Sequence, residues 1–199
     1  MIRVAGAVLA AGSGTRMGRP KGELVVAGER LLDRAVRTLV EAGCDPVIAV
    51  VREGVSVAGA NAVVNPDPDR GQRSSLQLAV DASAGCDALA VLLVDTPGIG
   101  TEAVRTVLAG WRPGRIARAR YRGGRGHPIV MDRALWREGL GHAVDDSGAR
   151  LLMRIKHHLV DEIAVPGDPS DLDTPDDLAH FLSSAPDTRS TRGEADAGE

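Results

Sequence analysis

Apolar runs alternate with amphipathic segments along most of the chain. The runs that predict buried strands cover residues 4–9, 46–51, 62–64 and 88–94. Apolar residues at helical spacing occur between the first two runs, where Gly43 can supply a left-handed cap, and again over residues 74–82 and 101–108. Strands that alternate with helices favour a mostly parallel sheet with helices on both faces.

The pattern loosens after Asp95. Residues 116–121 alternate like a half-exposed strand, and residues 127–131 can pair with them as an antiparallel hairpin. Two helices at residues 133–140 and 149–157 and a strand at 159–165 are expected to follow. Thr174 is the predicted N-cap of a last helix, with Pro175 at its first position and Asp177 closing a capping box. We expect one domain over residues 1–182 and a polar, disordered tail over residues 183–199.

The composition excludes several classes of protein. A chain of 199 residues with 43% hydrophobic residues can bury a full core, and its net charge of -3 does not suit a protein that coats nucleic acid. Cys44 and Cys86 match no zinc spacing. No apolar run is long enough to cross a bilayer, and the N-terminal run leads straight into basic residues. We therefore expect a cytoplasmic protein without nucleic-acid or membrane partners.

The segment after the first strand, residues 9–21, has the sequence L-A-A-G-S-G-T-R-M-G-R-P-K. Its glycines let the backbone approach a ligand, so that consecutive N–H groups can surround phosphate oxygens. Arg16 and Lys21 add cationic donors that suit a polyphosphate. Counted from Gly12, both the P-loop and the dinucleotide fingerprint require a glycine where this chain has Met17. An ordinary glycine-rich turn with solvated charges is the alternative interpretation.

This segment resembles the signature L-A-[AG]-G-x-[SG]-x-R-M-G-x-x-K of the MobA-like nucleotidyltransferases. Further matches to motifs of that family are N-P and G-Q-R-S-S-L within residues 65–76, V-D-T-P at 94–97, R-G-H-P at 125–128 and D-L-D-T-P at 171–175. The last two are most similar to the MocA-type molybdenum cofactor cytidylyltransferases. The resemblance implies a Rossmann-like three-layer α/β sandwich with a mostly parallel sheet and a small antiparallel hairpin. The chain departs from the family at Arg73, Thr96 and residues 145–150. These departures affect the expected identity of the acceptor more than the expected class of reaction.

The resemblance also implies roles for individual residues. The nucleotide-binding residues would be Leu9, Ala10, Ala11, Gly12, Gly14, Arg16, Lys21, Asn65, Ser74 and Ser75. The catalytic residues would be Arg16, Lys21 and Asp95, and the acceptor-binding residues would be Arg125, His127 and Arg150. Two simpler interpretations stay open: Ser74 as the N-cap of its helix, and His127 as an ordinary hairpin histidine.

Two carboxylates are candidates for holding Mg²⁺, which prefers hard oxygen ligands. Asp95 follows the most apolar strand, at the edge of the sheet where α/β proteins bind ligands. Asp173 is the second candidate, because it lies in the D-L-D-T-P motif. The alternatives are that Asp95 caps a turn and that Asp173 flanks the start of a helix.

The function expected from these features is transfer of a CMP (or GMP) group from a nucleoside triphosphate to the phosphate of molybdopterin, with release of pyrophosphate. Ala11 favours CTP over GTP in this family, and a molybdenum hydroxylase is the expected recipient of the product. Two alternatives stay open. The acceptor could be a sugar or alditol phosphate, or the protein could bind nucleotide without turnover as a maturation factor for a molybdenum enzyme.

Overall fold

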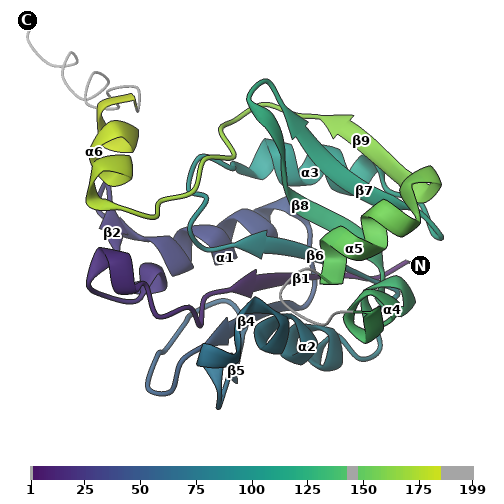
Figure 1. Cartoon of the computed structure of the whole chain (residues 1–199), viewed down its shortest axis with the longest axis horizontal. Helices are drawn as coiled ribbons and strands as arrows, with labels where there is room; N and C mark the ends of the chain where they lie inside the picture. The colour runs from purple at the N-terminus through teal and green to yellow at the C-terminus, as the bar shows by residue number, and fades with distance from the viewer. Residues whose placement is uncertain (1, 143–147, 185–199) are drawn as a thin grey trace, which may run out of the picture.

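A seven-stranded sheet runs through the molecule in the computed structural model, which describes residues 2–142 and 148–184 (Figure 1). The strands of this sheet are β1 (Val4–Leu9), β4 (Val47–Val51), β5 (Asn61–Val64), β6 (Ala88–Leu93), β7 (Ile116–Tyr121), β8 (Gly124–Asp132) and β9 (Val160–Ala164). The helices are α1 (Leu31–Ala42), α2 (Gln72–Ala82), α3 (Thr101–Gly110), α4 (Arg133–His142), α5 (Gly148–Ile155) and α6 (Pro175–Ser184). Two short strands, β2 (Val25–Val26) and β3 (Glu29–Arg30), form a separate antiparallel pair.

The strand order of the large sheet is β5-β4-β1-β6-β8-β7-β9. Neighbouring strands are parallel except at β8, which runs antiparallel to both β6 and β7. This confirms the predicted mostly parallel sheet. It also confirms the hairpin predicted from residues 116–121 and 127–131, although β8 already begins at Gly124.

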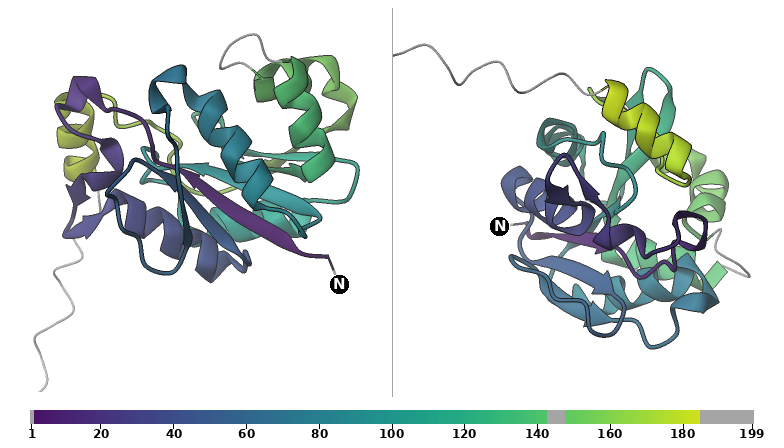
Figure 2. Two further views of the ribbon diagram at one scale, coloured as in Figure 1. Left: turned by 90° about the horizontal axis from the view of Figure 1, so that it is seen from below. Right: turned by 90° about the vertical axis from the view of Figure 1, so that its left-hand side faces the viewer.

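Helices cover both faces of the sheet (Figure 2). Helices α1 and α3 pack on one face through fully buried side chains such as Leu39 and Val104. Helices α2, α4 and α5 cover the other face, where Trp136 and Leu152 lie in a second core. The sheet is therefore the middle layer of a Rossmann-like three-layer sandwich, as predicted.

Two helix ends confirm what the local sequence predicts. Gly43 ends α1 in the left-handed conformation, with φ 98°. At the start of α6, the Thr174 N–H donates to Asp177 Oδ2 at 2.8 Å, and the Asp177 N–H donates to Thr174 Oγ1 at 3.2 Å. This reciprocal pair is the predicted capping box. Helix α6 ends at Ser184, two residues beyond the predicted domain limit, and the predicted tail from residue 185 onward lies outside the described residues.

The topology brings two distant segments together at one edge of the sheet. The chain passes from β1 to β4 and β5 and then returns through α2 to β6, which pairs with β1 on the other side. Leu9 and Leu93 are register partners, so β1 and β6 end side by side. Ligands of open α/β sheets bind at such carboxyl ends, where the winding reverses. None of the helices in the described part of the chain is long and apolar enough to cross a membrane.

Candidate nucleotide and acceptor site

The glycine-rich loop turns back on itself directly after β1. Gly14 has φ 59° and Gly18 has φ 70°, and these left-handed residues bracket a single 3₁₀ turn at Thr15–Met17. A Cβ atom on Gly14 would lie 2.1 Å from the carbonyl oxygen of Arg19, so the fold of this loop requires a glycine there. The loop delivers Lys21 to the edge of the sheet, where its side chain is 16% exposed.

A cavity of about 350 Å³ lies between this loop, the start of α2 and the carboxyl end of β6. Its walls include many of the predicted site residues, namely Leu9, Ala11, Gly12, Gly14, Lys21, Ser75 and Asp95. The other predicted nucleotide-binding residues, Ala10, Arg16, Asn65 and Ser74, are not among its wall residues. The fold thus gathers the glycine-rich loop and Asp95 around one hollow.

This cavity is also lined by residues that were not predicted for the site, namely Ser13, Pro68, Asp69, Gly71 and Gln72. The signal for this turn in the sequence is the glycine at position 71. In the structure Gly71 has φ 88° and ψ 179°, a conformation that is essentially restricted to glycine. The same turn explains why the prediction of Ser74 as a helix N-cap is wrong. Helix α2 already begins at Gln72, with Gly71 at the cap position.

Asn65 holds the segment that leads from β5 to α2. It is only 3% exposed, and its amide nitrogen donates to Ser74 Oγ at 2.9 Å and to Ser75 Oγ at 3.0 Å. Its carbonyl oxygen accepts the Asp67 N–H at 3.0 Å. Because these bonds use both ends of the amide, Asn65 fixes the position of Ser75 in the cavity wall.

Lys21 joins the two candidate metal ligands. Its ammonium nitrogen donates to Asp95 Oδ2 at 2.8 Å and to Asp173 Oδ1, which reaches it from the segment before α6. Arg16 adds an ion pair with the other oxygen of Asp173, at 3.6 Å. The Leu172 N–H donates to the Asp95 carbonyl at 2.8 Å, so the backbone also ties these segments together.

The electrostatics of this cluster favour a charged lysine. Partial burial acts to lower the pKa of Lys21, but the hydrogen bonds and charges of Asp173 and Asp95 outweigh it. The pKa of Lys21 is therefore raised above its ordinary value. Together the cluster carries two carboxylates and two cationic groups, of which the lysine is the better shielded from solvent.

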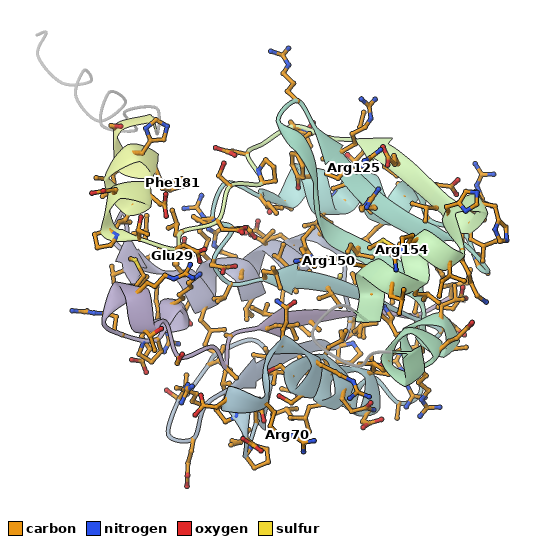
Figure 3. All side chains as sticks on the ribbon, in the orientation of Figure 1. Glu29, Arg70, Arg125, Arg150, Arg154 and Phe181 are labelled. Atoms are coloured by element: carbon orange, nitrogen blue, oxygen red, sulfur yellow. The ribbon has the colours of Figure 1, made fainter. Side chains whose placement is uncertain are left out.

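A second cavity, of about 500 Å³, adjoins the first through Leu93, which lines both. The three predicted acceptor residues, Arg125, His127 and Arg150, all line this second cavity, as does Arg118. Figure 3 shows Arg125 and Arg150 on the same side of the molecule, one on β8 and the other on α5.

Arginines outnumber carboxylates around this second cavity. Arg118 and Arg125 share one partner, Glu162 Oε1, at 2.7 and 2.6 Å. Within the described residues, the buried Nε of Arg118 has no hydrogen-bond partner. Arg118 was not among the predicted site residues, because the alternation of residues 116–121 places it on the polar face of its strand.

His127 has a defined protonation state. Its Nδ1 lies 3.0 Å from the Val91 carbonyl oxygen, which can only accept, so Nδ1 carries the proton. Burial lowers the pKa of His127, against opposing effects from the Val91 bond and from Asp95. The imidazole is therefore neutral near pH 7 and offers Nε2 as an acceptor, which suits an N–H or O–H donor better than a phosphate.

The residues that depart from the family pattern have structural partners. Arg73 donates to the Leu140 carbonyl at 2.9 Å, which links α2 to α4. Thr96 is buried and donates to the Leu93 carbonyl at 3.0 Å, next to the second cavity. Residues 145–147, which belong to the third departure, lie outside the described residues.

The chain is similar to known proteins in sequence and in fold. The family model of the MobA-like NTP transferase domain matches residues 6–162. The nicotine blue oxidoreductase of Paenarthrobacter nicotinovorans is 38% identical over 197 residues, covering 90% of this chain and 96% of the relative. A probable molybdenum cofactor guanylyltransferase of Opitutus terrae is 38% identical over 125 residues, which cover 61% of this chain and 62% of that relative. The structure of Rv0371c from Mycobacterium tuberculosis in complex with manganese superposes with a TM-score of 0.75 at 28% identity, covering 92% of this chain and 100% of the other.

Proposed function

The chain belongs to the MobA-like NTP transferase family, and from that premise we propose that it transfers a nucleotidyl group from CTP to the phosphate of a molybdopterin-type acceptor. The observation that carries this proposal is the cluster of Lys21, Asp95 and Asp173 beside the glycine-rich loop. Such a transfer needs a held triphosphate, a cation on its oxygens and an aligned acceptor. In this proposal the triphosphate would bind in the first cavity and the acceptor in the adjoining second cavity.

A divalent cation fits the residues at this site. Asp95 and Asp173 each place an oxygen on the same ammonium nitrogen, so the two carboxylates can also converge on one cation. Asp95 and Asp173 would hold Mg²⁺, which would neutralise charge on the α-phosphate during transfer. The manganese complex of Rv0371c, a structural relative, supports a divalent cation in this fold.

The triphosphate would lie along the glycine-rich loop. The N–H groups around Gly12 and Gly14 can surround phosphate oxygens, and Lys21 and Arg16 bring positive charge to them. The preference for CTP rests on Ala11, which is 1% exposed and lies in the cavity wall. A buried methyl group at that place narrows the space for the base, which favours a pyrimidine.

The acceptor side supports a ligand that carries a phosphate and a hydrogen-bond donor. Arg118, Arg125 and Arg150 line this cavity and provide positive charge that suits a phosphate. The neutral His127 would accept a hydrogen bond from an N–H group, which a pterin ring carries. A sugar or alditol phosphate would satisfy the arginines but would offer only hydroxyl donors to His127.

A second candidate function is the reduction or oxidation of a small heterocyclic compound. It is favoured by one observation, that the relative covering 90% of this chain is a nicotine blue oxidoreductase. The site favours nucleotidyl transfer instead, because two carboxylates around a lysine suit a cation and a triphosphate. Met17 also interrupts the dinucleotide fingerprint after Gly12 and Gly14.

One panel of assays separates these candidates. The protein is incubated with Mg²⁺, a molybdopterin acceptor and each of the four nucleoside triphosphates, and pyrophosphate is measured. A parallel set contains NADH or NADPH with a heterocyclic electron acceptor, and loss of the reduced cofactor is followed. We expect pyrophosphate with CTP and no cofactor oxidation. Tight binding of CTP without pyrophosphate would instead identify a maturation factor, and cofactor oxidation alone would identify an oxidoreductase.

A further inference from the structure

The two carboxylates that would hold a metal cation, Asp95 and Asp173, already share the positive charge of the Lys21 ammonium group. Lys21 Nζ donates to both Asp95 and Asp173, and the lysine and Asp95 side chains are only 16% and 20% exposed. Arg16, by contrast, is 76% exposed and reaches only Asp173, at 3.6 Å. Lys21 is therefore the group that an incoming metal ion meets between the two carboxylates.

A free metal ion finds few other ligands here. Among residues 2–142 and 148–184, no group of three or more His, Cys, Asp or Glu side chains is placed to hold a metal. Mg²⁺ and Mn²⁺ normally need about six ligands, which a site with one or two carboxylates completes with water and substrate phosphates. A metal ion without nucleotide would have to displace Lys21 and leave its ammonium without a new anionic partner.

A triphosphate changes this balance. Lys21 lines the same cavity as the N–H groups of the glycine-rich loop, so phosphate oxygens bound there come within its reach. Once the ammonium pairs with a phosphate, both carboxylates are released for the metal. The phosphates then add the ligands that the protein does not supply.

We propose that Lys21 occupies the cation position between Asp95 and Asp173 and exchanges it for the triphosphate when metal and nucleotide bind together. This inference rests on the proposed function and adds a coupling to it. Metal and nucleotide each bind weakly alone and strongly together, and by linkage each raises the affinity of the other by the same factor. The exchange breaks two ion pairs of Lys21 and forms one with phosphate, with no covalent change.

The lysine content of the chain makes the exchange directly observable. The sequence contains only two lysines, Lys21 and Lys156, and Lys156 pairs with Glu138 at 2.8 Å on the helical layer of α4 and α5. NMR of protein labelled at the lysine Cε and Nζ atoms therefore gives two signals, which Lys21→Arg assigns. We expect Mg²⁺ with CTP to shift the Lys21 signal strongly and Mg²⁺ alone to shift it little, while Lys156 stays constant. An unchanged Lys21 signal in the presence of bound Mg²⁺ and CTP would overturn the exchange.

Binding of Mn²⁺ tests the competition without turnover. Free Mn²⁺ is measured by electron paramagnetic resonance for wild type, Lys21→Met and the control Arg19→Met, which removes an exposed positive charge from the same loop. Without nucleotide, we expect Lys21→Met to bind Mn²⁺ about three- to fivefold more tightly, the scale of a lost competing ion pair, and Arg19→Met to match wild type. With CTP, the Mn²⁺ affinity should rise about tenfold or more in wild type and clearly less in Lys21→Met.

The outcomes of the Mn²⁺ experiment separate this inference from the proposed function. If Lys21→Met binds Mn²⁺ no better than wild type while wild type still binds CTP, Lys21 does not compete and the exchange is refuted. If wild type binds no nucleoside triphosphate with or without Mn²⁺, the proposed function fails. Circular dichroism and thermal unfolding of each variant establish that it is folded before its Mn²⁺ affinity is compared.

Discussion

Substitution of Gly14 by alanine tests whether the shape of the loop positions the triphosphate. The added Cβ would lie 2.1 Å from the Arg19 carbonyl oxygen and 3.0 Å from the Lys21 backbone nitrogen. An ordinary carbon-to-oxygen contact is about 3.3 Å, so the carbonyl has to retreat by about 1.2 Å. Lys21 follows in the chain and moves with it.

The expected effect of Gly14→Ala is large on turnover and moderate on stability. A left-handed alanine costs about 1–2 kcal/mol, which lowers the melting temperature by about 2–4 °C per kcal/mol in a chain of this length. Misplacing a positioning group by about 1 Å lowers kcat/KM by about 100-fold. We measure pyrophosphate release at varied CTP together with thermal unfolding.

Two glycines of the same loop are matched controls. Gly18 also has a positive φ, of 70°, but a Cβ there meets no atom within 4 Å, so Gly18→Ala carries the conformational cost alone. Gly12 lacks both the positive φ and a close neighbour, so Gly12→Ala should not destabilise the fold. If Gly14→Ala and Gly18→Ala reduced kcat/KM equally, the contact with Arg19 would not be what positions the loop.

Three further predictions follow from single residues. Ala11→Gly should shift the preference from CTP toward GTP by no more than about 1–3 kcal/mol in competition assays, and a wild type that binds GTP more tightly than CTP would contradict it. Asn65→Ala removes three hydrogen bonds of a buried side chain and should lower the free energy of unfolding in urea by about 2–4 kcal/mol, and a loss below about 1 kcal/mol would show that these bonds contribute little. Because burial lowers the pKa of His127 below 6.5, its protonation favours the unfolded state. The neutral imidazole therefore contributes its full stability above pH 6.5, and this contribution is lost as the pH falls. On acidification, wild type should lose more free energy of unfolding than His127→Asn. A difference between the two proteins that stays constant with pH would refute this.

Much of the fold could be predicted because its determinants are local. The run of residues 88–94 has no polar interruption and became the buried strand β6, while Gly43 and the Thr174 capping box ended and began helices where expected. Strands β2 and β3 could not be predicted, since two residues each carry no periodicity. The start of α2 was misplaced because the conformation of Gly71 depends on the turn before it.

The sequence predicts a set of residues for the candidate site but not the contacts between them. The loop sequence identified Lys21 and the end of β6 identified Asp95, yet their pairing spans 74 positions and the pairing with Asp173 spans 152. Both contacts depend on tertiary packing, which brings the segment after β6 and the segment before α6 next to the glycine-rich loop. Arg118 was missed for a related reason, because only the packed sheet shows that its Nε is buried.

In the proposed reaction, a cation held by Asp95 and Asp173 drives nucleotidyl transfer. The most direct test is pyrophosphate release from CTP against Mg²⁺ concentration, with a molybdopterin acceptor, for wild type and Asp95→Asn. The control is Asp45→Asn, which neutralises an exposed carboxylate. The Asp45 N–H donates to the Val4 carbonyl at the start of β1, so this residue lies at the end of the sheet away from the site. Since the cation stabilises charge that develops in the transition state, we expect Asp95→Asn to lose about 100-fold or more in kcat while CTP still binds, and Asp45→Asn to match wild type. If Asp95→Asn turned over like wild type at limiting Mg²⁺, Asp95 would be a turn residue and the account of this site would be wrong.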